Sequence, residues 1–255
     1  MLGKILSLTV RFVPRPILQR MSKAATFLLA IFLKGEGLVC PVCGGHFRRF
    51  LPYGRLRSRK NALCPGCQSL ERHRLIWLYL KQQTNFFQQS NDVLHIAPEN
   101  CFMDSFRLRH GNRYVTADIE SPLADVKMDI HQMPFKDHQF DFVLCNHVLE
   151  HVDDDLVAMK EIRRVLKPGG RAILQVPFFS PVPEKTFADP SLTDPREREK
   201  LFGQSDHIRR YGKDYAERIR SVGFNVSEES FGSKLDAKSV ERHALVPETI
   251  FVAIK

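Results

Sequence analysis

The chain has 255 residues, 43% of them hydrophobic and 26% charged, a composition that suits a soluble globular protein and excludes an intrinsically disordered one. The formal net charge is +9, but residues 1–75 hold 14 Lys and Arg against 2 acidic residues, whereas the remainder holds 24 against 27. The apolar run 24–33 has ten residues, about half of the ~20 that a transmembrane helix needs. It begins late and no small-residue cleavage pattern follows it, which argues against a secretory signal, so we expect a cytoplasmic protein.

A basic amphipathic leader is expected at residues 1–36, where no acidic residue occurs before the last position. Pro14 and Pro16 divide it into two short helical pieces. A basic helix with an apolar face can lie in a membrane interface or dock on its own domain. Peripheral contact of residues 1–35 with the inner membrane face and docking on the chain itself are therefore both open. The basic stretch 1–75 can meet an anionic partner such as phospholipid, RNA or a phosphorylated glycan, or can form a solvated surface.

Two Cys-x-x-Cys pairs follow the leader, within residues 37–68. Each Cys-x-x-Cys turn aims both sulfurs at one point, so two such turns can close a tetrahedral metal site. A redox-active pair or a pair of disulfides is the alternative, but two matched pairs without a thioredoxin-like context favour zinc. We expect a zinc ribbon with one structural ion and no catalytic role, and its ligands are Cys40, Cys43, Cys64 and Cys67.

A linker helix is expected within residues 69–91. Ser69 can serve as its N-cap, and Glu71 lies in the first turn, where the helix dipole favours an acidic side chain. Trp77 is expected to pack in the interior, and His73 is interpreted as a structural histidine.

A larger domain is expected at residues 92–255 and begins with short strand-like stretches. Val93–Ile96 is predicted as the first strand, and Tyr114–Asp118 as a second strand that ends in an acidic residue. Met128–Ile130 follows a further strand and has an aspartate at its centre.

Residues 140–176 predict a strand–helix–strand unit. Phe140–Cys145 is a short apolar run of the kind that forms a buried parallel strand. Acidic residues at 153–155 suit a helix N-terminus, and apolar residues then recur at three- and four-residue intervals up to Leu166. Lys167–Gly170 contains the proline and glycines that end the helix, so a second strand is predicted from Arg171, with a right-handed crossover.

The segments FDFVLCNHVLEHV (140–152) and EIRRVLKPGG (161–170), in this order and at this spacing, resemble the second half of class I S-adenosylmethionine-dependent methyltransferases, in particular the small-molecule type-11 group. CPGCQSLERHR (64–74) resembles a bacterial subgroup of these enzymes that carries an N-terminal zinc ribbon. The resemblance implies a seven-stranded, doubly wound (Rossmann-like) α/β sheet preceded by the ribbon, with S-adenosylmethionine as the cosubstrate.

The resemblance also implies which residues bind the cofactor. Asp118 ends its strand where a carboxylate can accept both ribose hydroxyls. Asp129 is expected to accept the exocyclic amine of adenine, and the Ile130 backbone to face the ring. The residues expected to bind the cofactor are His95, Ala97, Glu99, Asp118, Ile119, Asp129, Ile130 and Asn146.

The first cofactor loop departs from the family pattern. The usual acidic residue and glycine-rich loop are replaced by His95–Asn100, which contains no Gly-x-Gly. Ala97 is small enough to allow close approach of the backbone, and Glu99 can stand in for the missing acid near the cofactor's amino group. A non-catalytic relative with a decayed cofactor site stays open as an alternative.

The long proline-rich and charged segment after Pro177 is expected to cover the substrate side of the site, because loops of this length are usually functional. Its densest cluster of reactive side chains lies at 206–211. If the acceptor is a hydroxyl, a general base is needed, and His207 is the candidate, oriented by Asp206. His147, next to Asn146, is expected to border the transferred methyl group.

The remaining elements complete the predicted sheet. Lys213–Val222 is predicted as a helix, and Phe224–Ser227 and Thr249–Ala253 as the two strands of the hairpin edge typical of this fold.

These patterns predict a methyltransferase that acts on a small-molecule or glycan acceptor. The enzymatic alternative is an RNA base methyltransferase, because the ribbon carries Phe47, Phe50 and Tyr53 among arginines and could stack bases while holding phosphates. The non-enzymatic alternative is a membrane or protein adaptor. Binding of S-adenosylmethionine separates enzyme from adaptor, and salt-dependent RNA binding separates the two enzymes.

Overall fold

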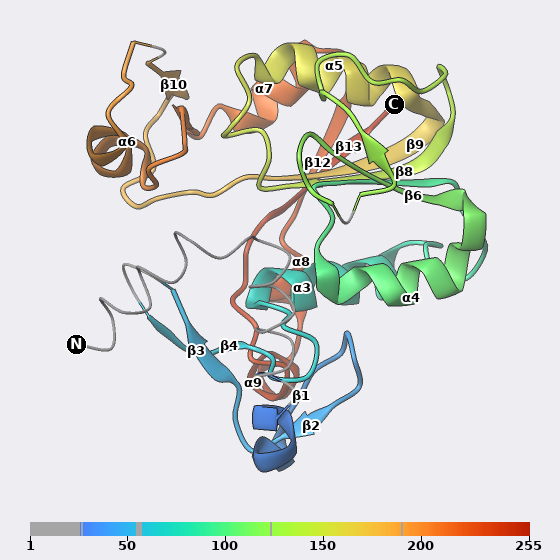
Figure 1. Ribbon diagram of the computed structural model, residues 1–255, viewed down its shortest axis with the longest axis vertical. Coiled ribbons are helices and arrows are strands. Elements are labelled where there is room, and N and C mark those ends of the chain that lie inside the picture. The colour runs from blue at the N-terminus through green and yellow to red at the C-terminus, as the bar shows by residue number, and fades with distance from the viewer. Residues whose placement is uncertain (1–25, 27, 55–57, 123, 190) are drawn as a thin grey trace. The chain divides into compact units, whose positions relative to one another are not determined.

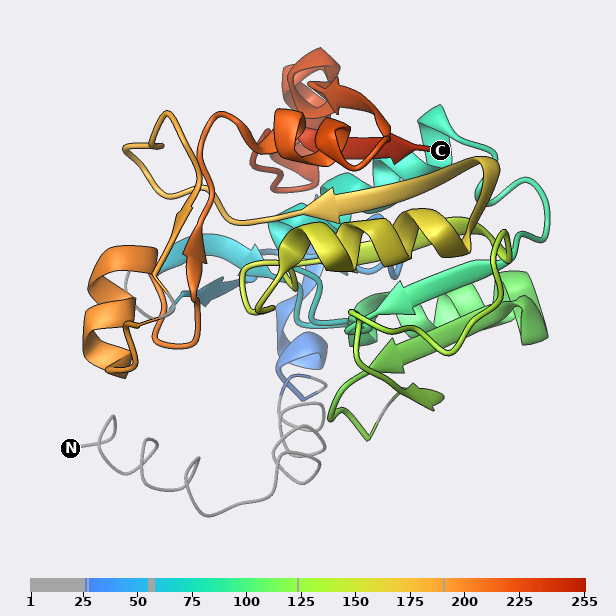
Figure 2. The same cartoon turned by 90° about the horizontal axis from the view of Figure 1, so that it is seen from above.

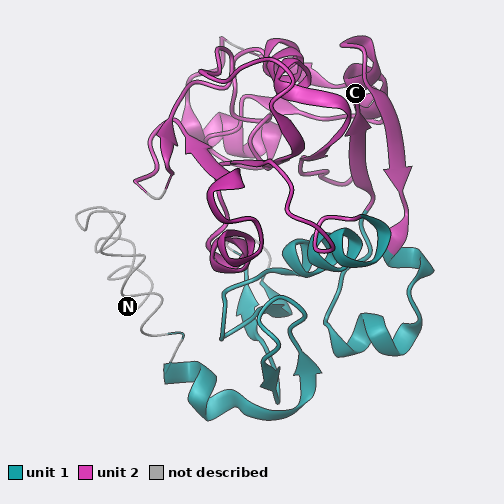
Figure 3. Ribbon diagram, turned by 90° about the vertical axis from the view of Figure 1, so that its right-hand side faces the viewer, with its two compact units in different colours: residues 1–84, 232–248 teal, residues 85–231, 249–255 magenta. Residues whose placement is uncertain are grey.

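The computed structural model describes residues 26, 28–54, 58–122, 124–189 and 191–255. Most of the expected leader therefore lies outside the described residues. The chain divides into two compact units, shown in Figure 3. The ribbon unit comprises residues 1–84 and 232–248, and the sheet unit comprises residues 85–231 and 249–255. Within the described ranges, no helix combines the length and the apolar content needed to cross a bilayer.

The ribbon unit is built from two small antiparallel strand pairs and short helices. Strand β1 pairs with β2, and β3 pairs with β4. Its elements, labelled in Figure 1, are β1 (Lys34–Val39), β2 (His46–Phe47), β3 (Leu51–Tyr53), β4 (Arg59–Leu63), α3 (Glu71–Gln83) and α9 (Ala237–Arg242), with α8 (Phe231–Lys234) beginning at the boundary between the units. The segment 232–248, which the sequence places in the larger domain, thus lies in this unit.

Arg74 of α3 joins the distant parts of the ribbon unit. Its side chain is fully buried, and its guanidinium donates to the carbonyl oxygens of Ala62 and Ser69 at 2.9 and 2.8 Å. It also donates to the carbonyl oxygens of His243 and Ala244, each at 2.7 Å. A buried cation is costly unless its donors are satisfied. These bonds satisfy the guanidinium of Arg74 and connect segment 232–248 to the ribbon strands.

The sheet unit is a seven-stranded sheet with the order β12-β13-β9-β8-β5-β6-β7, in which β13 alone runs antiparallel to its neighbours. Helices α5 and α7 cover one face and α4 covers the other (Figure 1). Its main elements are β5 (Val93–Ile96), α4 (Asn100–His110), β6 (Tyr114–Asp118), β7 (Val126–Lys127), β8 (Phe140–Asn146), α5 (Asp155–Val165), β9 (Leu166–Gln175), α7 (Tyr215–Ser221), β12 (Asn225–Glu229) and β13 (Ile250–Ile254). The predicted seven-stranded doubly wound sheet is confirmed.

The strand–helix–strand unit lies where the sequence predicts it. Asp154 caps α5 by accepting from the backbone amides of Leu156 and Val157. Gly169 has φ +76°, a left-handed conformation that glycine adopts without steric cost. The second strand begins earlier than expected, at Leu166 rather than Arg171, with an irregular register beside β8.

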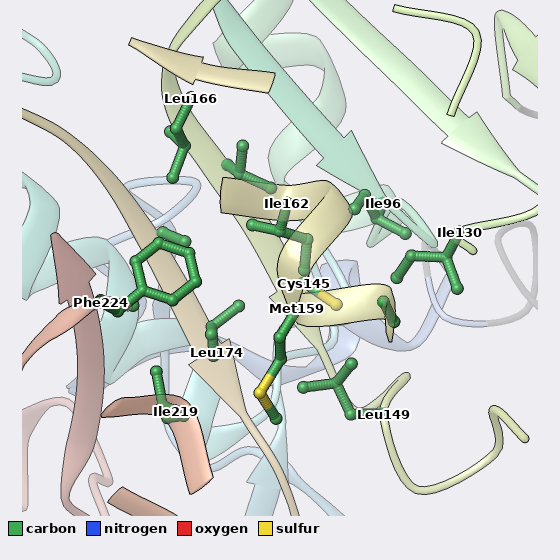
Figure 4. Packing of buried hydrophobic residues seen from close by; sticks show 14 of the residues in the cluster. Ile96, Ile130, Cys145, Leu149, Met159, Ile162, Leu166, Leu174, Ile219 and Phe224 are labelled. Carbon is green, nitrogen blue, oxygen red and sulfur yellow. The ribbon is translucent and has the colours of Figure 1, made fainter. Parts of the chain in front are cut away.

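The apolar face of α5 packs into the main core of the sheet unit. Met159 and Ile162 are fully buried in one cluster with Cys145 of β8 and Leu174 of β9, as Figure 4 shows. Burying a side chain of this size stabilises the fold by about 1.5–3 kcal/mol. This cluster holds β8 and β9 rigidly, and the loops at their carboxyl ends carry the site described below.

The segment after β9 forms a small subdomain of the sheet unit. Strands β10 (Phe187–Ala188) and β11 (Arg209–Arg210) pair antiparallel, and α6 (Pro195–Phe202) lies between them in the chain. Figures 1 and 2 show this subdomain beyond the carboxyl ends of β8 and β9. The long segment predicted to cover the site is therefore partly regular structure.

Candidate functional site

The four cysteines of the ribbon form a compact cluster. The Sγ atoms of Cys40 and Cys67 are 3.6 Å apart, those of Cys43 and Cys64 are 3.8 Å apart, and all four lie within 4.8 Å of one another. A zinc ion about 2.3 Å from each of four tetrahedral sulfurs would place those sulfurs about 3.8 Å apart. All four thiols are free, and the cluster has the donor set and spacing of a structural zinc site.

Ser69 belongs to this cluster and does not cap α3. Its hydroxyl lies 3.2 Å from Sγ of Cys40 and 3.3 Å from Sγ of Cys67. The N-cap is Leu70, whose backbone amide donates to Nδ1 of His73 at 3.1 Å. The predicted capping role of Ser69 was wrong, because its hydroxyl is within hydrogen-bond distance of two cysteine sulfurs. The ring of the buried His73 accepts from the N-cap amide instead.

A cavity of about 260 Å³ lies at the carboxyl ends of β5 and β6. Five of the eight residues expected to bind the cofactor line it. The remaining wall includes the apolar side chains of Ile96, Met128, Val148 and Val152. The loop after β8 also contributes His151 and Asp153. The five expected residues are Ala97, Asp118, Ile119, Asp129 and Ile130.

Two aspartates of this cavity are held by local hydrogen bonds. Oδ1 of Asp118 accepts from the backbone amides of Glu120 and Ser121, at 2.8 and 2.7 Å. Oδ1 of Asp129 accepts from the backbone amide of His131 and lies 2.7 Å from its Nδ1. These amide and ring bonds lower the pKa of Asp129, so this carboxylate is anionic at neutral pH.

The loop after β5 takes the shape of a glycine turn without a glycine. Ala97 has φ +50°, in the left-handed region that side chains larger than glycine rarely adopt. Its amide donates to the carbonyl oxygen of Ala117 at 2.9 Å, which ties the loop to β6. Apart from glycine, alanine has the smallest side chain, so Ala97 leaves more room beside this turn than a larger residue would.

The other three expected cofactor residues form a hydrogen-bonded chain. Nδ1 of the buried His95 lies 2.7 Å from the Tyr114 hydroxyl, and its Nε2 contacts the carboxylate of Glu99. Nδ2 of Asn146 donates to Oε1 of Glu99 at 3.1 Å. Glu99 is thereby positioned between the carboxyl ends of β5 and β8, next to the turn at Ala97.

The three residues expected to act in catalysis do not form the arrangement that the sequence suggested. His207 is fully buried rather than exposed on a loop, and burial lowers its pKa. Its carboxylate neighbour is Glu150, whose Oε1 lies 4.0 Å from His207 Nε2. Asp206, expected to orient His207, has an exposed side chain near His151. His147 lies 3.3 Å from the same Glu150 oxygen.

The arginine and tyrosine beside His207 hold the loop after β8. Arg209 is buried and its Nη1 donates to the carbonyl oxygens of Leu149 and Val152, at 2.8 and 3.0 Å. The hydroxyl of buried Tyr211 lies 3.1 Å from the carbonyl oxygen of Leu149. Arg209 and Tyr211 thus satisfy buried backbone carbonyls, and these bonds support the loop after β8.

Comparison with known proteins shows which proteins parts of this chain resemble. Residues 84–174 match the family model of the methyltransferase domain. Residues 84–174 are therefore similar to class I S-adenosylmethionine-dependent methyltransferases, by a match that covers less than half of the chain. Over 85 residues it is 49% identical to demethylmenaquinone methyltransferase of Staphylococcus aureus, which is 33% of this chain and 28% of that protein. Over 57 residues it is 42% identical to an uncharacterized 37.1 kDa transposon protein of Streptomyces fradiae, 22% of this chain and 16% of that one.

The chain thus spans less than a third of the length of these curated relatives. Among solved structures, an S-adenosylmethionine-dependent methyltransferase of Mesorhizobium loti shares 14% identity and a TM-score of 0.47, covering 71% of this chain and 96% of that one.

The cavity at the carboxyl ends of β5 and β6 offers groups that would fit S-adenosylmethionine. Ile119 and Ile130 provide apolar surface for a flat ring, and Asp118 provides an acceptor for hydroxyl groups at the end of β6. Glu99 provides a second carboxylate beside the loop at Ala97, suited to a cationic amino group. When bound, S-adenosylmethionine supplies an electrophilic methyl group on a sulfonium.

Neither Glu150 nor the cavity residues His131, Val148 and His151 were singled out from the sequence. Glu150 and His151 stand in the motif HVLEHV, and only the motif's family resemblance drew attention to it. The signal was present, since His147, Glu150 and His151 have the i, i+3, i+4 spacing that brings side chains to one side of a turn. His131 and Val148 also line the cavity and carried no such signal.

Proposed function

We propose that this methyltransferase transfers a methyl group from S-adenosylmethionine to a small-molecule or glycan acceptor. The observation that carries the proposal is the cavity where Ala97, Asp118, Ile119, Asp129 and Ile130 meet. These residues come from separate loops, at the carboxyl edge of a parallel sheet, where open α/β sheets bind their ligands. The relative from Staphylococcus aureus is named for demethylmenaquinone, a small molecule, which supports an acceptor of that class.

The ribbon unit supports a structural zinc ion held by Cys40, Cys43, Cys64 and Cys67, which we include in the proposal. It gives less support to RNA binding. Phe47 and Phe50, expected to stack bases, are only 6% and 2% exposed, so they belong to the ribbon core. Tyr53 is exposed, but a single ring does not make the stacking platform that single-stranded RNA requires.

The adaptor alternative loses its main support as well. It rested on a decayed cofactor loop at 95–100. In the structure, Ala97 adopts the glycine-like turn, and His95, Glu99 and Asn146 are joined by hydrogen bonds. A site that had lost its ligand would have no reason to keep a buried, connected polar network.

The acceptor class is tested with S-adenosylmethionine carrying a labelled methyl group. The purified protein is incubated with cell extract separated into small molecules, polysaccharide, RNA and protein. We expect label in the small-molecule or polysaccharide fraction. Label confined to RNA would establish the alternative enzyme, and no binding of S-adenosylmethionine by calorimetry would refute the enzymatic proposal itself.

A further inference from the structure

A second group of side chains that could bind a metal ion lies in the sheet unit, apart from the cysteines. Glu150 and His151 come from the loop after β8, and His207 precedes β11. We call these three the Glu–His–His group. One ligand atom from each lies within 4.8 Å of the others. His151 also lines the cofactor cavity, so the group lies next to the proposed site of methyl transfer.

The carboxylate of this group is buried without compensation. Glu150 is 1% exposed, and within the described part of the chain neither of its oxygens accepts a hydrogen bond. His147 Nδ1 and His207 Nε2 approach Oε1 at 3.3 and 4.0 Å without hydrogen-bond geometry. A buried carboxylate costs several kcal/mol unless a cation or donors compensate it. A cation beside the Glu150 carboxylate would compensate its buried charge.

Both histidines of the group have Nδ1 beside a backbone carbonyl oxygen. Nδ1 of His151 lies 3.1 Å from the carbonyl oxygen of Asp206, and Nδ1 of His207 lies 3.2 Å from the carbonyl oxygen of Phe202. A carbonyl oxygen can only accept, so each Nδ1 carries the proton and each Nε2 keeps its lone pair. Ligating histidines in metalloproteins have this arrangement, in which a backbone carbonyl fixes the ring and its tautomer. Nε2 of His207 is buried and has no hydrogen-bond partner among the described residues.

The loops that carry the group are held rigidly toward each other. The backbone amide of Ile208 donates to the carbonyl oxygen of Glu150 at 3.0 Å, and Arg209 donates to the carbonyl oxygens of Leu149 and Val152. The backbone next to His207 is thus hydrogen-bonded to the backbone of Glu150. Fixed backbones on both sides hold the three side chains close together before any ion arrives, which favours binding.

We propose that Glu150, His151 and His207 bind a divalent transition-metal ion. Two imidazole nitrogens and one carboxylate suit the ions of the Mn²⁺ to Zn²⁺ series, and three protein ligands leave positions open. Which group fills the open coordination position rests on the proposed function. An acceptor hydroxyl bound there has its pKa lowered by the ion. With that lower pKa, the hydroxyl would release its proton to bulk water and keep the electron pair on its oxygen. That oxygen would then attack the methyl carbon while the carbon–sulfur bond breaks and its electron pair goes to sulfur. The acceptor class is therefore a hydroxylated molecule.

The ion is tested directly with Co²⁺ on the full chain, with zinc already bound to the cysteines. Cobalt bound by nitrogen and oxygen absorbs in the visible range without the sulfur-to-metal charge-transfer band of a thiolate site. We expect one cobalt per chain in addition to the zinc. Glu150→Gln and His151→Gln should each weaken cobalt binding at least tenfold. His46→Ala, which removes an exposed ribbon histidine, is the matched control and should bind cobalt as the wild type does.

Three results would overturn the proposal: no cobalt beyond the zinc in the wild type, wild-type cobalt affinity in both glutamine variants, or loss of binding in His46→Ala. Because Glu150 is buried, its variant can fail to fold. His151 is partly exposed and provides the independent variant. Calorimetry with S-adenosylmethionine on the same samples separates the two proposals. Cobalt binding without cofactor binding would uphold the ion site and refute the proposed function, and the reverse would refute the ion site alone.

Discussion

Arg218 of α7 forms a two-point ion pair with Asp155, the first residue of α5. Its Nη2 donates to Oδ1 at 2.6 Å and its Nε donates to Oδ2 at 3.1 Å. The Asp155 side chain is 2% exposed, and the same carboxylate lies 3.0 Å from the hydroxyl of Tyr211. One buried carboxylate thus joins two helices and the segment that carries His207.

Asp155→Ala is therefore expected to lower the free energy of unfolding of the sheet unit by about 3–5 kcal/mol. The reason is that it leaves the charge of Arg218 without its buried acceptor, whereas the hydroxyl of Tyr211 keeps the carbonyl oxygen of Leu149. Urea denaturation followed by circular dichroism measures the change. The matched control is Asp137→Ala, which removes an exposed carboxylate that pairs with Arg164. A loss no larger than that of the control would contradict the structural role of Asp155.

The ribbon unit is expected to contain one zinc ion per chain and to depend on it. Chelation, or Cys43→Ser, should unfold the ribbon while the sheet unit stays largely folded, because metal binding and folding are coupled in so small a module. Metal analysis and hydrogen exchange report the two effects. Cys101→Ser, which changes a cysteine of α4 outside the cluster, should keep the zinc. A zinc content far below one per chain in the wild type would refute the site.

Asp118→Ala is expected to weaken S-adenosylmethionine binding at least tenfold without unfolding the protein. Each lost bond from a ribose hydroxyl to the carboxylate should cost ~1.5–3 kcal/mol. Calorimetry on the purified variants gives the affinities, with Asp104→Ala, an exposed position on α4, as the control. Unchanged affinity in Asp118→Ala would mean that the cofactor binds elsewhere.

The left-handed conformation of Ala97 makes a prediction for its substitution. Ala97→Gly should keep cofactor binding and stabilise the loop by up to about 1 kcal/mol, because glycine adopts φ +50° without strain. Ala97→Val should weaken both folding and cofactor binding, because a β-branched side chain is disfavoured there. Thermal denaturation and calorimetry of the pair decide it. Equal behaviour of the valine and glycine variants would show that the turn is not required.

His110 should make the sheet unit sensitive to acid. Burial, with help from Arg109 and Arg113, lowers the pKa of His110 to about 4, from 6.5 for an unperturbed histidine. Between these pH values the unfolded chain takes up a proton that the folded chain does not bind, so the free energy of unfolding falls as the pH is lowered, by up to about 3 kcal/mol. His110→Gln should make this decline shallower. Hydrogen exchange of β5 and β6 across that pH range measures it, and an unchanged slope would argue against the effect.

Much of the fold follows from local patterns in the sequence. The apolar run at 140–145, the acidic helix start at Asp154 and the turn at Gly169 each predict their element from neighbouring residues, and the structure confirms the strand–helix–strand unit. The limits are less predictable. Leu166 begins a strand rather than ending a helix, because its pairing with Phe140 across the sheet outweighs the helical spacing.

The candidate site divides in the same way. Cys-x-x-Cys spacing is a local property, so the cysteine cluster could be read directly. The partner of His207 could not, because nothing near His207 in the chain indicates that it lies beside Glu150. Asp206 was the reasonable expectation from adjacency, yet its side chain is exposed and near His151.

Sequence by itself thus determined the order of the main strands and helices along the chain, and the residue types at the cysteine cluster and at the cavity, because these depend on spacing over a few turns of chain. Tertiary structure decided which groups are buried and what satisfies them. Arg74 bonds residues 243–244 to the ribbon unit, and Arg209 supports the loop after β8 through that loop's carbonyl oxygens. The physical reason is that a buried charge or polar group must find its partner in space, and that partner can come from any part of the chain.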